Sequence, residues 1–114
     1  MTECIFCKIA RAEMKAQVIY SDEDVVAFRD INPQAPTHVL VIPRKHIPSI
    51  ADCAPDDLPL LAKLLQTGAK IAEMESIRES GYRLVLNAGP DAGQAVNHLH
   101  VHVLGGRKMT WPPG

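Results

Sequence analysis

Three histidines occupy every second position of an apolar segment near the C-terminal end of the chain, His98-Leu99-His100-Val101-His102-Val103. A β-strand turns successive side chains to opposite faces, so this spacing predicts a strand over residues 96–104 with the imidazoles in one row. A core filled with three imidazoles is unfavourable, because each ring brings nitrogens that need hydrogen-bond partners. The pattern therefore favours a chemically active surface, since imidazole serves as nucleophile, acid, base or metal ligand near neutral pH.

The length of 114 residues fits one domain, residues 1–114, with a single core. Hydrophobic residues make up 46% and the net charge is −1, which indicates a soluble globular protein and gives no electrostatic case for binding nucleic acid or an anionic membrane. No apolar run approaches the roughly 20 residues that span a bilayer, and the first four residues lack the basic start of a signal peptide. We expect a cytoplasmic protein.

The first half of the chain predicts three strands. Apolar runs at 17–20 and 25–28 flank a polar turn and predict a hairpin, and residues 37–42 predict a third strand. The intervening residues 30–36 contain two prolines, which withhold backbone donors and restrict the residues before them. We expect a loop of fixed shape that is suited to holding a ligand.

The second half predicts one long helix and two strands. Leucines and alanines recur at intervals of three and four over residues 54–77, with Pro59 tolerable only in the first turn. A short helical segment is expected at 6–12, a strand at 82–87, and a glycine-rich loop at 88–95 before the histidine strand. The order of elements predicts an α+β fold: a mainly antiparallel sheet of about five strands with one long and one short helix.

The sequence resembles the histidine triad (HIT) family, and within it the HINT branch. The signature is His-x-His-x-His followed by apolar residues, here at 98–104, and further likeness lies in Cys4-Ile5-Phe6-Cys7-Lys8-Ile9, in residues 27–38 and 42–46, in Gly105-Gly106-Arg107 and in Trp111-Pro112-Pro113-Gly114. The resemblance covers nearly the whole chain in the same order. It implies a HIT-like α+β fold and a homodimer with a continuous sheet.

The resemblance also implies a catalytic set of four histidines. His100 is the position of the nucleophile, His102 donates to the phosphate oxygens, and His38 sets the protonation state of the triad, of which His98 is the first member. An imidazole nitrogen that attacks phosphorus forms a phosphoryl-histidine that water then hydrolyses, which divides one slow displacement into two easier ones. Acid and base assistance of this kind contributes about 10² to 10⁴ in rate.

A nucleotide site follows from the same resemblance. Asn87, Gly93 and Gln94 would contact the phosphate together with His100 and His102, and Asp30 would accept hydrogen bonds from the ribose hydroxyls. Five apolar residues would wall the base: Ile5, Phe6, Ile9, Phe28 and Ile31. The alternatives are a turn-capping role for Asp30 and a plain core role for Ile5, Ile9 and Phe28.

One position departs from the pattern. HINT-branch enzymes commonly carry a serine two residues before the position of Asn97, close to the phosphate, and this chain has Ala95 there. A methyl group cannot donate a hydrogen bond, so one contact to the phosphate or the leaving group is missing. The substitution bears on rate or substrate preference more than on the class of reaction.

The cysteines suggest a metal site. Cys4-x-x-Cys7 has the spacing of half a tetrahedral zinc site, and the resemblance supplies His46 and His98 as the other two ligands of a structural Zn²⁺. The alternative is a pair of unbound thiols, because Cys-x-x-Cys alone is half a signature. Cys53 has no evident partner and is expected to be a small residue that is buried or half-buried.

Together these features predict a hydrolase of nucleoside 5′-monophosphate derivatives, similar to adenosine 5′-monophosphoramidase. It would cleave the P–N bond of purine nucleoside phosphoramidates through a nucleotidyl-His100 intermediate and would need no cofactor for catalysis. A non-catalytic nucleotide-binding or protein-interaction module is the first alternative, favoured by Ala95. A zinc-sensing or zinc-storage protein is the second.

Overall fold

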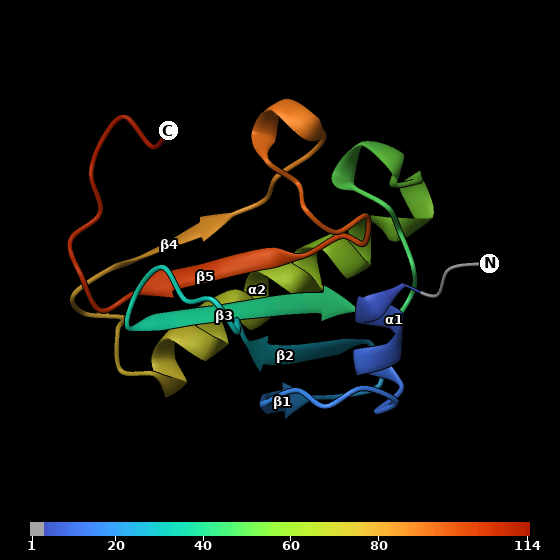
Figure 1. Ribbon diagram of the computed structural model, residues 1–114, viewed down its shortest axis with the longest axis horizontal. Coiled ribbons are helices and arrows are strands. Elements are labelled where there is room, and N and C mark those ends of the chain that lie inside the picture. The colour runs from blue at the N-terminus through green and yellow to red at the C-terminus, as the bar shows by residue number, and fades with distance from the viewer. Residues whose placement is uncertain (1–3) are drawn as a thin grey trace.

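A five-stranded antiparallel sheet forms the centre of the computed structural model, which describes residues 4–114 (Figure 1). The strand order is β1-β2-β3-β5-β4. The strands are β1 (Val18–Ser21), β2 (Val25–Arg29), β3 (Thr37–Pro43), β4 (Tyr82–Val85) and β5 (Val101–Gly105). Every pairing in this order is antiparallel. The predicted α+β class with a mainly antiparallel sheet is confirmed.

The long helix α2 (Leu58–Met74) covers one face of this sheet, behind β3 and β5 in Figure 1. Its buried side chains include Leu64 and Ile71, which pack in one cluster with the valines of β3 and β5 that point to this side. Pro59 lies in the first turn of α2, where a missing N–H removes no intrahelical hydrogen bond. The helix is shorter than the predicted 54–77, because residues 55–57 form a 3₁₀ turn ahead of it.

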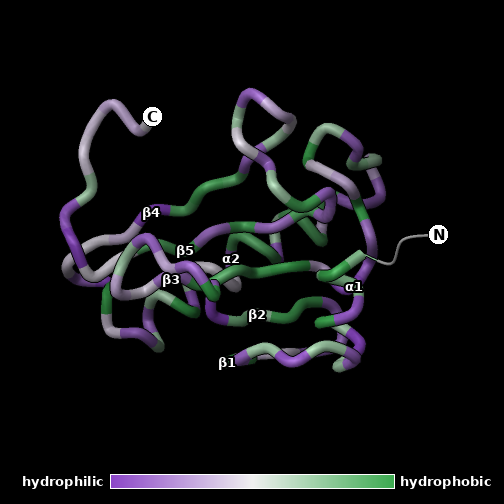
Figure 2. Tube along the Cα trace, viewed as in Figure 1, coloured by the Kyte–Doolittle hydropathy of each residue, from purple (hydrophilic) through white to green (hydrophobic). Residues whose placement is uncertain are grey.

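The short helix α1 (Ile5–Ala10) packs against the opposite face, at the end of β3 (Figure 1). Phe6 and Ile9 of α1 are buried in a second cluster with Phe28 and Leu40 of the sheet. Figure 2 shows long hydrophobic stretches in the central strands β2 and β3. The sheet is therefore covered on both faces, but α1 covers only part of its face.

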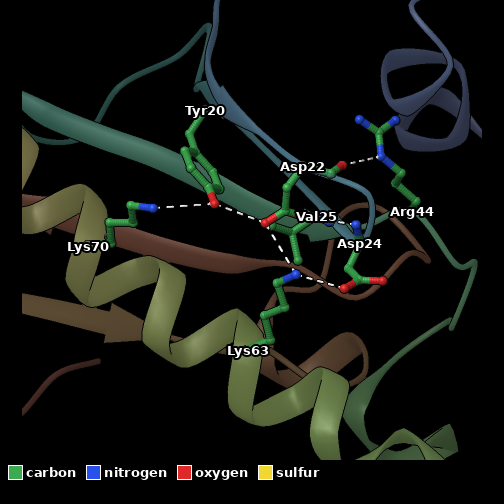
Figure 3. A network of polar contacts seen from close by, with 7 residues as sticks. All are labelled: Tyr20, Asp22, Asp24, Val25, Arg44, Lys63 and Lys70. Carbon is green, nitrogen blue, oxygen red and sulfur yellow. Dashed lines mark hydrogen bonds and ion pairs between the residues drawn. The ribbon is translucent and has the colours of Figure 1, made fainter.

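A network of polar side chains ties the β1–β2 turn to α2 (Figure 3). Lys63 of α2 lies 3.2 Å from Asp22 Oδ2 and 2.7 Å from Asp24 Oδ2, and Tyr20 donates to Asp22 at 2.9 Å. Burial alone would raise the pKa of Asp22, but hydrogen bonds from the backbone N–H groups of Asp24 and Val25 hold it well below its ordinary value. The charged carboxylate is thus part of the folded hairpin.

The histidine strand starts later than predicted: β5 begins at Val101, so His98 and His100 precede it. The ladder between β3 and β5 stops because β3 ends at Pro43, which has no N–H, and the N–H of Leu99 donates to Ile47 at 2.7 Å instead. The side-chain alternation nevertheless continues through this segment. Leu99 packs in the cluster under α2, whereas His98 and His100 lie against the ring of Phe6.

The remaining boundaries differ by at most two residues. For example, β4 ends at Val85 rather than at residue 87, and α1 occupies 5–10 rather than 6–12. Within residues 4–114, none of the helices combines the length and the apolar character that crossing a membrane requires.

Candidate active site

A cavity of about 320 Å³ opens beside α1, on the face of the sheet opposite α2. Its wall is mostly apolar, and its polar groups include Asp30, His100 and His102. The other lining residues are Ile5, Phe6, Ile9, Met14, Lys15, Ala16, Phe28, Arg29, Ile31, Leu40, Ala95 and Val96. An apolar pocket with a few convergent polar groups is the usual form of a small-molecule site.

The ring of His100 is buried and held from two sides. Its Nδ1 lies 2.7 Å from the backbone carbonyl oxygen of His98, and its ring meets the edge of Phe6 at a centroid distance of 5.2 Å. A carbonyl oxygen only accepts hydrogen bonds, so the proton of the neutral ring is on Nδ1. The other nitrogen, Nε2, then carries a lone pair, which is the requirement for a nucleophile.

His102 has the opposite proton arrangement, and two successive hydrogen bonds impose it. The backbone N–H of Gln34 donates to Nδ1 of His38 at 3.0 Å, so the proton of neutral His38 is on Nε2. That Nε2 lies 2.9 Å from Nδ1 of His102 and donates to it. His102 therefore carries its own proton on Nε2. The pocket thus has one lone pair and one N–H on neighbouring rings, whose centroids are 5.0 Å apart.

The two rings joined by this hydrogen bond, His38 and His102, are neutral near pH 7. Burial lowers the pKa of His102 to about 4, and the nearby His100 and His38 rings act in the same direction against the opposing carboxylate of Asp30. Burial also lowers the pKa of His38, again with Asp30 opposing. Neutral rings keep the donor and acceptor pattern defined by the hydrogen bonds.

Asp30 is placed at the junction of the pocket and the histidines. Its Oδ2 lies 3.4 Å from Nε2 of His38, and its Oδ1 accepts the backbone N–H of Asn32 at 2.8 Å. The turn-capping alternative is therefore observed, and the same side chain lines the pocket. The carboxylate of Asp30 therefore accepts a hydrogen bond within the loop and also lines the pocket.

Asp30, His38 and His102 lie close enough together to suggest metal ligands. The hydrogen bonds oppose this assignment, since Nδ1 of His38 already accepts the N–H of Gln34. A metal at Nε2 would leave His38 with no proton on either nitrogen, which is unfavourable for imidazole near neutral pH. The chemistry of the three side chains fits a proton relay.

A second cluster lies behind the pocket, where α1 meets the residues that follow β3. Nδ1 of His98 is 3.4 Å from Cys4 Sγ, 3.6 Å from Cys7 Sγ and 3.2 Å from Nδ1 of His46. Tetrahedral zinc with usual bond lengths separates a sulfur and a nitrogen ligand by about 3.6 Å, and two nitrogens by about 3.3 Å. The four ligand atoms fit this arrangement.

The other nitrogen of His98 fixes the ring for this role. Nε2 lies 2.8 Å from the carbonyl oxygen of Pro43, so the proton is on Nε2 and the lone pair of Nδ1 points into the cluster. Histidines that bind metals commonly donate their second N–H to a carbonyl in this way. The same carbonyl belongs to the residue that ends β3.

Comparison with known proteins identifies the family. The model of the HIT domain family matches residues 11–109. The chain belongs to the histidine triad (HIT) family. The purine nucleoside phosphoramidase of Escherichia coli K12 is 48% identical over 107 residues, which cover 94% of this chain and 90% of that enzyme.

Solved structures agree with the HIT assignment. The crystal structure of a HIT family hydrolase from Legionella pneumophila Philadelphia 1 is 54% identical, with a TM-score of 0.96 over 98% of this chain and 100% of that chain. A Zn-bound histidine triad family protein from Mycobacterium smegmatis is 33% identical, with a TM-score of 0.78 over 92% and 76% of the two chains. The Legionella structure and the E. coli enzyme support a hydrolase.

Most residues that the sequence assigned to the HIT site lie together. The pocket is lined by His100, His102, Asp30 and the whole expected apolar wall, Ile5, Phe6, Ile9, Phe28 and Ile31. Phe6, Ile9 and Phe28 are also core residues, so the core role suggested for Ile9 and Phe28 is observed, and contact with a base stays a prediction. Ile31 is fully exposed at the rim, which leaves its side chain uncovered in this single chain.

Three expected phosphate contacts are not among the lining residues: Asn87, Gly93 and Gln94. The side chain of Gln94 accepts the N–H of Gly89 at 3.0 Å and donates to the carbonyl of Val96 at 3.0 Å within its own loop. It also donates at 2.7 Å to the carbonyl of Pro48, in the segment after β3. Its amide therefore shapes the loop before the triad. Phosphate contact by these three residues stays a prediction.

Sequence reasoning missed several residues of this HIT site, Arg29, Leu40 and Val96 among them. Met14, Lys15 and Ala16 line the pocket from the segment before β1, where no motif marks them. Gln34 contributes through its backbone N–H, which no side-chain pattern reveals. The departure at Ala95 was visible in the sequence, and Ala95 does line the pocket.

Proposed function

We propose that this HIT protein hydrolyses nucleoside 5′-monophosphate derivatives, and specifically the P–N bond of purine nucleoside phosphoramidates. The observation that carries the proposal is the opposite proton arrangement of two neighbouring rings, with a lone pair on Nε2 of His100 and a proton on Nε2 of His102. Attack on phosphorus needs the first, and stabilisation of the phosphate oxygens needs the second. The 48% identity to a purine nucleoside phosphoramidase supports the same reaction.

The reaction divides into two displacements. Nε2 of His100 forms a bond to phosphorus as the P–N bond breaks, and the amine leaves with a proton taken from the site. A water molecule then attacks phosphorus as the bond between phosphorus and Nε2 of His100 breaks, which returns the electron pair to that nitrogen. The hydroxyl of the water stays on the nucleotide, and its proton restores the one that the amine removed. During both steps the carbonyl of His98 holds Nδ1–H of His100, which stabilises the positive charge of the phosphorylated ring.

The remaining pocket residues would bind the nucleoside. The apolar wall of α1 and β2, with Phe6, Ile9 and Phe28, suits a purine ring, and the carboxylate of Asp30 suits two adjacent ribose hydroxyls. We further infer that a homodimer forms, as the resemblance implies, with β4 available as an edge strand of the sheet.

Zinc in this proposal is structural. Cys4, Cys7, His46 and His98 would hold the ion, which when bound would join α1 to the segments after β3 and before β5. The Zn-bound relative supports this assignment. Catalysis would use side chains alone, since His100 and His102 are outside the ligand set.

Single-turnover hydrolysis of adenosine 5′-phosphoramidate by wild type and His100→Ala tests the proposal, with intact-protein mass spectrometry to detect added AMP. We expect release of amine and an AMP adduct in the wild type, and neither in the variant. Full hydrolytic activity of His100→Ala would overturn the assignment of the nucleophile.

A non-catalytic nucleotide-binding module is the second candidate, favoured by Ala95, which gives the pocket a methyl group where a hydroxyl would donate. The same experiment separates the two functions. Saturable AMP binding by the wild type without amine release or adduct would support the binding module. More than one zinc ion per chain, lost when His100 or His102 is replaced, would instead indicate zinc storage.

A further inference from the structure

The chain after β5 packs closely against the loop that precedes β3. Gly106 has a φ of 87°, and a Cβ added there would lie 2.9 Å from Cβ of Pro36. Only glycine combines that backbone conformation with so close an approach. Figure 1 shows the C-terminal segment turning away beside this loop.

Arg107 follows directly and binds the same loop. Its Nε donates to the carbonyl oxygen of Gln34 at 3.0 Å, and its Nη1 donates to the carbonyl of Lys108 at 3.2 Å. The guanidinium thus joins the C-terminal segment to Gln34. The loop is further ordered by the Gln34 side chain, which donates to the carbonyl of Asn32 at 3.1 Å.

Gln34 is also the residue whose N–H donates to Nδ1 of His38 at 3.0 Å. If Gln34 rotates away, Nδ1 of His38 loses its donor and the proton of His38 is free to move to that nitrogen. Nε2 of His38 then becomes an acceptor, and Nδ1 of His102 must carry a proton to keep the 2.9 Å contact. His102 would then have no proton on Nε2.

We propose that Arg107 is a positioning residue for the reaction: through the carbonyl of Gln34 it holds the N–H that sets the tautomers of His38 and His102. The inference rests on the proposed function for its kinetic consequence, but the tautomer itself is a property of the folded protein. Arg107 is not among the residues that line the pocket, so its effect would pass through the loop. Its side chain is exposed in this structure, so its replacement leaves the core intact.

The test compares Arg107→Met with Arg83→Met. Arg83 donates from Nη2 to the carbonyl of Thr110 at 3.0 Å, so it holds the same C-terminal segment without contacting the loop or the histidines. Methionine retains an unbranched apolar stem in both variants. Arg83→Met therefore controls for loosening of the C-terminal segment alone.

Two readouts are needed. In the first, steady-state hydrolysis of adenosine 5′-phosphoramidate, Arg107→Met should lower kcat about 10- to 100-fold, a part of what acid and base assistance contributes, with KM within about twofold. In the second, imidazole ¹⁵N spectra, wild-type His102 should show an unprotonated Nδ1 and a protonated Nε2. These signals should shift toward the other tautomer in Arg107→Met and stay unchanged in Arg83→Met.

Arg107→Lys gives a graded check and a folding safeguard, because lysine supplies one donor without the planar fork of arginine. We expect values of kcat and ¹⁵N shift between those of the wild type and Arg107→Met. Unchanged His102 tautomers in Arg107→Met would overturn the proposal, and so would equal losses of kcat in the Arg107→Met and Arg83→Met variants. If no variant hydrolyses the substrate, the proposed function fails, and the ¹⁵N spectra still decide the role of Arg107.

Discussion

Nε2 of His38 lies 2.9 Å from Nδ1 of His102, and the direction of this hydrogen bond is set by a backbone N–H on the far side of His38. A main-chain amide is a donor at every pH, so it fixes the acceptor nitrogen of the first ring and, through it, the donor nitrogen of the second. The structure therefore defines which nitrogen of His102 faces the site as an N–H. The imidazole of His102 alone, without this series of hydrogen bonds, would not define which nitrogen carries the proton.

Replacing His102 should separate its donor role from its bulk. His102→Ala removes the Nε2–H and should lower kcat about 10²- to 10³-fold with little change in KM, because the lost hydrogen bond strengthens only as charge develops on the phosphate. His102→Gln retains amide donors of similar reach and should lose less. Steady-state kinetics on adenosine 5′-phosphoramidate measure both. Equal losses would show that hydrogen-bond donation is not what His102 contributes.

The depressed pKa of His102 also makes stability depend on pH. Between about pH 6.5 and pH 4 the unfolded chain binds a proton on His102 that the folded chain does not, so the free energy of unfolding falls as the pH is lowered through this window. From pH 7 to pH 5 the contribution of this single group is about 2 kcal/mol.

Urea denaturation at these two pH values, for wild type and His102→Gln, measures that contribution. We expect the loss of stability on acidification to be smaller in the variant by about 2 kcal/mol, since its glutamine does not titrate. His38 and His98 also have lowered pKa values and remain in both proteins, so they cancel in the comparison. Parallel pH dependence in the two proteins would contradict the prediction.

The period-two spacing of the histidines was enough to predict which side chains share a face. His98 and His100 lie against Phe6, and Leu99 lies under α2, although this segment is outside the paired strand. The start of the strand could not be predicted, because it depends on Pro43 ending the neighbouring strand and on Ile47 taking over the N–H of Leu99. The face to which each side chain points follows from local spacing in the sequence. The start of the paired strand depends on residues that are distant in the sequence.

The candidate site divides in the same way. Cys4 and Cys7 lie three positions apart in the sequence and are visible there as half a metal site, whereas His46 and His98 join them only through the fold. The relay was less predictable still, because its direction comes from the backbone N–H of Gln34, and a backbone group leaves no mark in the residue pattern. The sequence was enough to predict which side chains form the site. The conformation of the loop that carries Gln34 determines which nitrogens of His38 and His102 carry protons.

The cysteine-histidine cluster predicts one tightly bound zinc ion per chain. Cys4→Ser and Cys7→Ser should reduce zinc content well below one ion per chain and lower the melting temperature by at least about 5 °C, because metal binding contributes directly to folding. Elemental analysis by mass spectrometry and thermal unfolding measure these changes. Cys53→Ser is the matched control, since Cys53 is also partly buried and lies outside the cluster.

A zinc content near zero in freshly purified wild type, unchanged after refolding with zinc, would contradict the structural-zinc prediction. A second informative comparison is the His100→Ala variant, which should keep its zinc because His100 is not among the four ligands. Loss of zinc in that variant would show that His100 is itself a zinc ligand and would contradict the proposed ligand set.

Ala95 offers a substitution that should increase activity. It is exposed and lines the pocket together with His100 and His102, so a hydroxyl there has room and lies near the proposed phosphate position. A new hydrogen bond formed mainly in the transition state is worth about 1 kcal/mol, so Ala95→Ser should raise kcat about fivefold. Hydrolysis of adenosine 5′-phosphoramidate by wild type, Ala95→Ser and Ala95→Val decides this. Valine adds volume without a hydrogen-bond donor, so a higher kcat with serine alone assigns the effect to the hydroxyl. An unchanged kcat with serine would show that the methyl group at this position does not limit the reaction.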